Sequence, residues 1–351
     1  MISLPKAGEA TEETKADAAE HTEPADEAKR ADPADEAERA DPDAAGPRSG
    51  EKRSVWKAWF QAARPSFYIA TLAPLTLGFT AAGKFSGEYD WPFFLLILLA
   101  CLLVHMAANL ANDLFDHLQG VDAGPGRIGG SRVIQEGKIS PRALALALVV
   151  LYSLALALAF VVVRHSKVEA LWPLIIFAAL SSFFYVAPPI KYGHRALGEL
   201  FVFLNMGLIM TAGTFLALCG RWDGRIIALA LPLAFMVAGI LYYQSLPEID
   251  ADLAAGKRTL ANLLGKTRAA FLFLLWWPLV WLLMINLWFA GLAAWPALLG
   301  PATAPLHLMA CRRVKAAGDG DWLELDLHGH LVRKLYLING LILIAAAALG
   351  G

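Results

Sequence analysis

Residues 109–122 read NLANDLFDHLQGVD, and the interpretation of the whole chain starts from them. The stretch ends an apolar run over 91–111 that is long enough to cross the hydrocarbon core of a bilayer. Carboxylates at a membrane interface need water, a basic partner or a metal ion to stay charged. One aspartate there would fit a solvated helix end. Two asparagines and three aspartates within one short stretch predict a functional site.

The spacing within this stretch predicts a polar helix face. If the apolar run continues as a helix, Asn109, Asn112 and Asp116 share one face through i+3 and i+4 spacing. Asp113 lies about 100° around the helix from Asn112. Asp122 falls beyond a glycine that suits a helix C-terminus.

A second polar stretch, 244–260, reads QSLPEIDADLAAGKRTL and also follows a long apolar run. Glu248 and Asp252 are four residues apart and share a helical face, whereas Asp250 points away from it. Mg²⁺ binds oxygen ligands, uses one or two carboxylates and keeps positions for phosphate oxygens. Two acidic helix ends with basic loops behind them therefore suit Mg²⁺ and a phosphate-bearing ligand.

The composition is that of a membrane protein with an unusual N-terminus. The chain has 351 residues, 57% hydrophobic and 17% charged, with a mean hydropathy of +0.51. Residues 1–50 hold 14 acidic and six basic residues, a net charge of −8, so the rest carries +7 within a total of −1. We expect 1–51 to be a disordered acidic tail, either solvated or used for docking, and 52–351 to be one polytopic domain. The tail lacks the apolar core of a secretory signal and is too acidic for a transit peptide.

The apolar runs predict an all-α membrane protein whose helices surround a central cavity. The nine expected transmembrane helices cover 66–83, 91–112, 142–164, 168–187, 197–219, 226–245, 269–289, 293–311 and 333–350. Lys and Arg concentrate in the loops after the even-numbered spans, so the positive-inside rule places the N-terminus and both acidic stretches on the cytoplasmic side. The cavity should open there. The three cysteines fall in or beside apolar runs and show no metal or disulfide spacing.

The same residues carry a family resemblance. The first stretch has the form N-x-x-N-D-x-x-D-x-x-x-G-x-D and resembles the Asn-Asp-rich motif of the UbiA superfamily of intramembrane aromatic prenyltransferases. It is most similar to the branch that prenylates 1,4-dihydroxy-2-naphthoate on the way to menaquinone. The second stretch resembles that superfamily's D-x-x-x-D motif followed by G-K-x-T-L, and the similarity runs from about residue 64 to the C-terminus. This chain departs from the branch in the second motif, where Gln244, Ser245 and Glu248 replace the usual opening Asn and the first Asp.

The resemblance implies a set of site residues. Those expected to be catalytic and, apart from Asp113, to hold Mg²⁺ are Asn112, Asp113, Asp116, Asp122, Glu248 and Asp252. Those expected to contact substrate are Arg64, Asn109, Arg127, Arg132, Tyr185, Lys191, Gln244, Lys257 and Arg258. The basic side chains would hold diphosphate, although loop Lys and Arg also serve as contacts to lipid headgroups. Tyr185 begins the sequence YVAPPIK, which resembles a family patch, and could turn its ring face toward a cation.

The implied activity is Mg²⁺-dependent transfer of a polyprenyl group from its diphosphate to an aromatic acceptor, with 1,4-dihydroxy-2-naphthoate as the first candidate. Another aromatic or quinone-related acceptor is the alternative within this class. A non-catalytic membrane protein that binds isoprenoids or quinones is the alternative outside it. A transporter is disfavoured because the acids gather at one face and not along a path across the bilayer. We expect a bacterial-type cytoplasmic membrane as the location and no nucleic-acid partner; protein partners and the prenyl chain length stay open.

Overall fold

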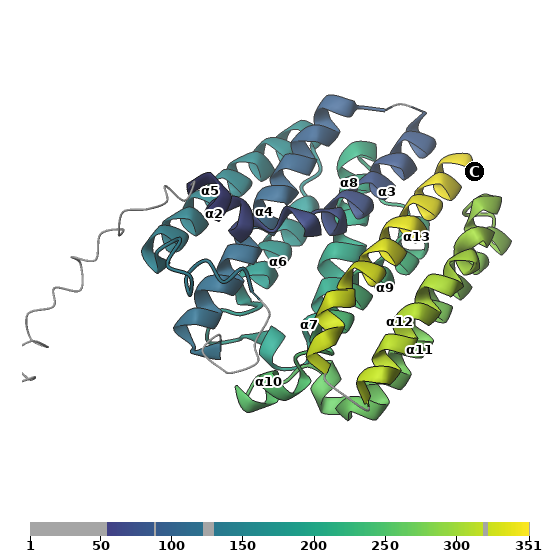
Figure 1. Ribbon diagram of the computed structural model, residues 1–351. Coiled ribbons are helices and arrows are strands. Elements are labelled where there is room, and N and C mark those ends of the chain that lie inside the picture. The colour runs from purple at the N-terminus through teal and green to yellow at the C-terminus, as the bar shows by residue number, and fades with distance from the viewer. Residues whose placement is uncertain (1–54, 88, 122–129, 319–321, 351) are drawn as a thin grey trace, which may run out of the picture. The chain divides into compact units, whose positions relative to one another are not determined.

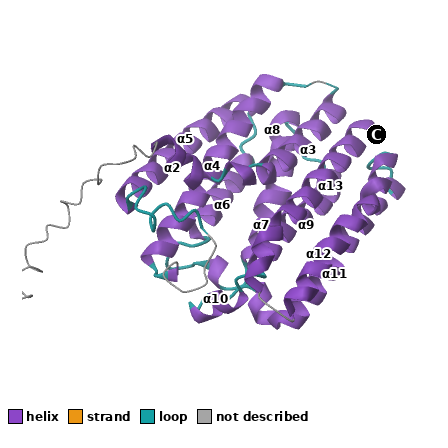
Figure 2. Ribbon diagram, viewed as in Figure 1, coloured by secondary structure: helices purple, strands orange, loops and turns teal. Residues whose placement is uncertain are grey.

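The computed structural model describes residues 55–87, 89–121, 130–318 and 322–350, and the regular structure in these ranges is helical (Figures 1 and 2). The predicted acidic tail, Asp122 and Arg127 lie outside the described residues. The prediction of an all-helical fold is confirmed for the part that is described.

The helices follow one another without a sheet between them in the described ranges. In chain order they are α2 (Val55–Ala63), η1 (Pro65–Phe67), α3 (Ile69–Ser86), α4 (Trp91–Leu118), α5 (Pro141–Ser166), α6 (Leu171–Phe184), η3 (Tyr192–His194), α7 (Gly198–Val202), η4 (Phe203–Ile209), α8 (Met210–Cys219), α9 (Arg225–Ser245), α10 (Ile249–Ala254), α11 (Leu260–Phe289), η5 (Trp295–Thr303), α12 (Ala304–Gly318), η6 (Trp322–His328) and α13 (Gly329–Leu349). The segment η4 is a π-helix, which continues α7 into α8.

Length and composition support six membrane spans in the described part of the chain, or seven if a pair bent by 50° at α2–η1 and α3 counts as one. The six are α4, α5, α7 through α8, α9, α11 and η6 with α13. The predicted span 168–187 contains α6, which has only 14 residues, and the predicted span 293–311 covers η5 and the first part of α12. The helices mark a multi-pass membrane protein, while the arrangement of nine spans stays a prediction.

Local sequence signals explain where the long helices start. Asp90 accepts a hydrogen bond from the backbone N–H of Phe93 (3.0 Å) at the start of α4, and Ser140 does the same for Ala143 (3.2 Å) at the start of α5. A proline occupies the first turn of both helices, where its missing N–H costs nothing. Gly265, with φ 73° and ψ 159°, bends α11 near its start.

The packing makes α9 the central helix. In the apolar stretch of α9 about 72% of the residues are buried, against 28% in that of α11. The helix α9 therefore lies among other helices, and α11 lies at the periphery. The helix α9 contacts α11, α13 and η4, whereas α4 packs along α5 and α3 packs along α8 (Figure 1). Leucines such as Leu95 on α4 and Leu156 on α5 are more than half exposed, as expected for side chains that meet lipid tails.

Candidate active site

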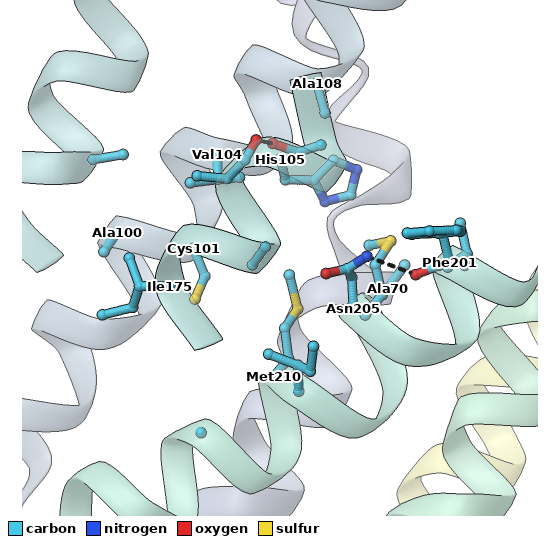
Figure 3. A pocket seen from close by; sticks show the side chains of 18 of the residues that line it. Ala70, Ala100, Cys101, Val104, His105, Ala108, Ile175, Phe201, Asn205 and Met210 are labelled. Atoms are coloured by element: carbon cyan, nitrogen blue, oxygen red, sulfur yellow. Dashed lines mark hydrogen bonds between the residues drawn. The ribbon is translucent and has the colours of Figure 1, made fainter. Parts of the chain in front are cut away.

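A cavity of about 390 Å³ lies among α3, α4, α5, α6, η4, α8 and α9. Its walls are mainly apolar, with Ala100 and Cys101 from α4 and Ile175 from α6 (Figure 3). The polar side chains of the lining are Arg64, His105, Asn109, Asn112, Tyr152, Ser182, Tyr185, Tyr192, Asn205, Thr214 and Gln244. An apolar chamber with a few convergent polar groups suits a lipid-like ligand with a polar end.

The first acidic stretch continues α4 as a helix to Leu118, as its spacing predicts. Asn109 and Asn112 line the cavity, and the Asn109 side chain donates to the carbonyl oxygen of Ala63 (3.0 Å). Asp116, one turn further, is buried. The polar face expected from the i+3 and i+4 spacing therefore begins in the cavity wall and ends in a buried carboxylate.

Asp113 has different neighbours from those of the other acids. One of its carboxylate oxygens accepts from the Arg64 guanidinium and from the backbone N–H of Ser131 (3.0 Å), and the other accepts from the Ser131 hydroxyl. Its side chain is buried and does not line the cavity, whereas Arg64 does. This geometry makes Asp113 the residue that positions Arg64 at the cavity.

The loop after Ser131 is fixed to α2. Gln61 donates to the carbonyl oxygen of Ser131 (2.7 Å) and accepts from the Lys138 ammonium (2.7 Å). Hydrogen bonds from Lys138 and Gln61 lower the pKa of Glu136. This network holds the segment that carries Arg132 next to the end of α4.

The second acidic stretch forms the short helix α10. Asp252 is buried, and its carboxylate lies 3.4 Å from the Lys257 ammonium. Glu248 is half-buried at the start of the helix, and its carbonyl oxygen accepts from the backbone N–H of Asp252 (2.7 Å). Asp250 is exposed and pairs with Lys266 (2.6 Å), so its predicted direction away from the other two acids is confirmed.

Residues 191–197 join the two acidic stretches. The His194 ring nitrogen Nε2 lies 3.2 Å from an Asp116 carboxylate oxygen, and both side chains are buried. The carbonyl oxygen of His194 accepts from the N–H of Arg258 (3.1 Å), whose own carbonyl oxygen accepts from Ala196 (2.9 Å). The Tyr192 hydroxyl anchors this segment to α6 by donating to Ser181 (2.7 Å), and burial raises the pKa of Tyr192. One segment thus contacts α4 through a side chain and the α10 loop through its backbone.

Three of the predicted cations share an uncommon backbone geometry. Arg64, Arg132 and Lys191 have φ values of 50°, 59° and 41°, in the left-handed region that disfavours side chains with a Cβ. Each such residue costs about 1–3 kcal/mol, and such residues cluster at functional sites. Lys191 and Arg132 are half-buried, whereas Arg258 is exposed and enters the site through its backbone.

The acids do not converge on one point. Within the described ranges, no three His, Cys, Asp or Glu side chains are close enough to hold one metal ion by themselves. Mg²⁺ takes only one or two carboxylates per ion and completes its shell with water and substrate oxygens. Buried Asp116 on α4 and buried Asp252 on α10 supply oxygen donors of that kind. The donor set therefore fits Mg²⁺ held together with a ligand.

Several polar residues of the cavity, among them His105 and Asn205, were missed by the sequence reasoning. His105 lies four residues before Asn109, and extending the same helical face backwards would have found it. Asn205 is a polar residue inside the apolar span 197–219, which is itself a functional signal. His194 gave no such signal, because no spacing relates it to the acids.

Comparison with known proteins agrees with this geometry. The sequence model of the UbiA prenyltransferase family matches residues 71–324. The chain is 25% identical over 252 residues to a 1,4-dihydroxy-2-naphthoate octaprenyltransferase of Bacillus subtilis, covering 71% of this chain and 79% of that protein. It is 28% identical over 309 residues to a UbiA prenyltransferase domain-containing protein 1 of Danio rerio, covering 87% and 90%.

The fold has solved counterparts. A UbiA homologue from Archaeoglobus fulgidus, determined bound to DMAPP and Mg²⁺, superposes with a TM-score of 0.59 at 17% identity, over 83% of this chain and 99% of that one. This likeness shows a common helical fold. The family match extends over more than half of the residues and includes both acidic stretches. The resemblance found in the two motifs is confirmed, and the chain belongs to the UbiA prenyltransferase family.

Proposed function

We propose that this protein transfers a polyprenyl group from its diphosphate to an aromatic acceptor, with 1,4-dihydroxy-2-naphthoate as the first candidate. The observation that carries the proposal is that residues 191–197 connect the two acidic stretches. This segment contacts Asp116 through His194 and the loop after Asp252 through Arg258, beside an apolar cavity of about 390 Å³. A diphosphate could sit among these groups while its hydrocarbon tail occupies the cavity.

We propose that the acidic residues of the site bind Mg²⁺ and that the basic residues contact the diphosphate. Asn112, Asp116, Glu248 and Asp252 would hold Mg²⁺, and Asp122 is proposed as a further ligand by its place in the motif. Mg²⁺ bound there would neutralise charge that develops on the departing diphosphate. Arg64 lines the cavity and is oriented by Asp113, so it can direct its guanidinium to the same group.

The other predicted basic residues lie in loops near the acidic stretches. Lys257 is held 3.4 Å from Asp252, and Lys191 lies in the segment that joins the two motifs. Arg258 follows Lys257 in the loop after α10, and Arg127 and Arg132 come between α4 and α5 in the sequence. We propose these three as further diphosphate contacts on the strength of the motif.

The cavity wall suits the second half of the reaction. Ionisation of an allylic diphosphate leaves a cation that must meet the acceptor ring before it meets water. Apolar walls exclude water, and the aromatic ring of Tyr185 lines the cavity with its neighbour Tyr192 edge-on at 5.4 Å. Such π faces stabilise a nearby cation. We infer that these two tyrosines flank the reacting carbon.

The acceptor is the finer part of the proposal. The Bacillus relative is named for 1,4-dihydroxy-2-naphthoate, which supports that ring as the first candidate. Gln244 lines the cavity at the position where the naphthoate branch usually opens its second motif with Asn, so a different aromatic or quinone-related acceptor is the runner-up. We also propose that the cavity opens to the cytoplasm of a bacterial-type membrane, because the positive-inside rule predicts that the basic loops and the acidic motifs face the cytoplasm.

An assay with purified full-length protein tests the function. The protein, in detergent or lipid nanodiscs, is incubated with Mg²⁺, a labelled polyprenyl diphosphate and a panel of aromatic acceptors. Naphthoate as acceptor should yield a prenylated product with release of carbon dioxide. Turnover of another ring and none of naphthoate would move the assignment to the runner-up. Absence of turnover with every acceptor, in protein that binds isoprenoid diphosphate, would favour a non-catalytic binding protein.

A further inference from the structure

Asn205 is a polar residue of the cavity that the proposed chemistry does not use. Asn205 lies in the π-helix η4, about two turns into the span that begins at Gly198. Its side-chain amide nitrogen donates to the carbonyl oxygen of Phe201 (2.9 Å), whereas its oxygen Oδ1 is buried without a hydrogen-bond partner among the described residues. Figure 3 shows the nitrogen turned to Phe201 and the oxygen at the opposite end of the amide, on the side of the cavity.

The hydrogen bond between Asn205 and Phe201 determines which end of the amide faces the cavity. The atom facing the Phe201 carbonyl must be a donor, so the amide orientation follows from chemistry and leaves the oxygen inward. A buried acceptor without a partner is destabilising. π-Helical segments are uncommon and often occur at functional sites. The segment η4 therefore presents a fixed hydrogen-bond acceptor in an otherwise apolar stretch of wall.

An acceptor selects a ligand that can donate. The ionised diphosphate offers only acceptors, and a prenyl chain offers neither donors nor acceptors. A phenolic hydroxyl is a donor, and its ring would find aromatic neighbours here, since Phe201 lies in the lining and stacks on Tyr192 at 4.0 Å. Of the substrates in the proposed reaction, only the aromatic acceptor fits this group.

We propose that Asn205 is a specificity-determining residue that accepts a hydrogen bond from a hydroxyl of the aromatic acceptor. The proposal deepens the proposed function, on which it rests, by placing the acceptor ring beside η4. His105 on α4 also lines the cavity; its Nδ1 is 2.6 Å from the Thr71 hydroxyl, which holds the ring in place. In this proposal Asn205 accepts a hydrogen bond from the hydroxyl of the aromatic acceptor, and the acidic motifs bind the diphosphate through Mg²⁺.

The test compares a bicyclic phenol, 1-naphthol, with its methyl ether, which cannot donate. Equilibrium dialysis with full-length purified protein, without diphosphate, should give wild-type binding that favours the phenol by about tenfold or more, the usual value of one buried hydrogen bond. In Asn205→Leu the phenol-to-ether ratio should fall to about one. A matched control is Asn286→Leu: Asn286 makes the same bond to a carbonyl four residues earlier (Leu282, 2.7 Å), but on the exposed face of α11. Its ratio should equal that of the wild type.

A second variant separates loss of the hydrogen bond from a general loss of folding. Asn205→Ser can still bond the Phe201 carbonyl through its hydroxyl but lacks the inward carbonyl oxygen, so it should also lose the discrimination. In turnover assays, Asn205→Leu should raise KM for the aromatic acceptor about tenfold and leave KM for the prenyl diphosphate unchanged. An undiminished phenol-to-ether ratio in both Asn205 variants would overturn the inference. Wild-type discrimination without turnover of any acceptor would instead overturn the proposed function and leave the subsite standing.

Discussion

The contact between His194 and Asp116 gives the most direct test of how the site is assembled. The two side chains are 8% and 7% exposed and lie 3.2 Å apart, although the residues are 78 positions apart in sequence. His194→Ala removes the side-chain contact, while the backbone bonds of His194 and Ala196 to Arg258 can persist. The substitution therefore loosens Asp116 without cutting the join between the two acidic stretches.

The expected magnitude follows from the burial of the pair. A hydrogen bond to a charged group contributes about 1.5–3 kcal/mol, and this pair is too buried for water to replace it fully. Because about 1.4 kcal/mol corresponds to a tenfold change in rate, His194→Ala should lower kcat/KM by about tenfold to 150-fold. A less constrained Asp116 should also bind metal less well, so the Mg²⁺ concentration for half-maximal rate should rise.

The assay measures prenyl transfer at varied Mg²⁺ together with thermal unfolding in the same detergent. His194→Gln, whose amide can donate to Asp116, should recover much of the rate. In an Asp116→Asn background, His194→Ala should have little further effect, because residues that act as a unit are non-additive. A wild-type rate and Mg²⁺ dependence in His194→Ala, or a fall in thermal stability with no change in Mg²⁺ dependence, would refute the reasoning.

Three further outcomes are expected. Asp116→Asn and Glu248→Gln should each lower the rate by about 10² to 10³, with the double variant little worse and Glu248→Asp substantially active; full activity of Asp116→Asn in the transfer assay would contradict this. Asp113→Ala should destabilise the protein by about 3–5 kcal/mol in thermal or denaturant unfolding, because Arg64 loses its buried partner; an unchanged unfolding midpoint would show that Arg64 is held otherwise. Deletion of residues 1–50 should leave membrane insertion and turnover largely unchanged, and a truncated protein that inserts but has lost activity would point to a docking role for the tail.

Features that depend on neighbouring residues were predictable from the sequence. The continuation of α4 past the apolar run follows from helical spacing, and so does the separation of Asp250 from Glu248 and Asp252. The motif residues were sufficient to indicate the family that the wider comparison then showed. The span count was less accessible, because apolar runs such as 168–187 do not reveal that the helix inside them is only 14 residues long.

The roles within the site were not predictable in the same way. Asp113 was grouped with the catalytic acids, but in the structure its carboxylate orients Arg64, 49 residues away. Asn205 is recognisable in sequence only as a polar residue in a span, and the structure adds that it lines the cavity and that its nitrogen donates to the Phe201 carbonyl, which leaves its oxygen free to accept.

The sequence by itself determined which segments are helical, which faces are polar and to which family the motifs belong, because these follow from periodicities of a few residues and from local composition. The tertiary structure decided which partner each charge has. His194 meets Asp116, Arg64 meets Asp113, and the backbone of Arg258 meets residues 194–196, because the packing of helices distant in sequence brings these groups within hydrogen-bond distance. Such pairings depend on three-dimensional distance, which no spacing along the chain encodes.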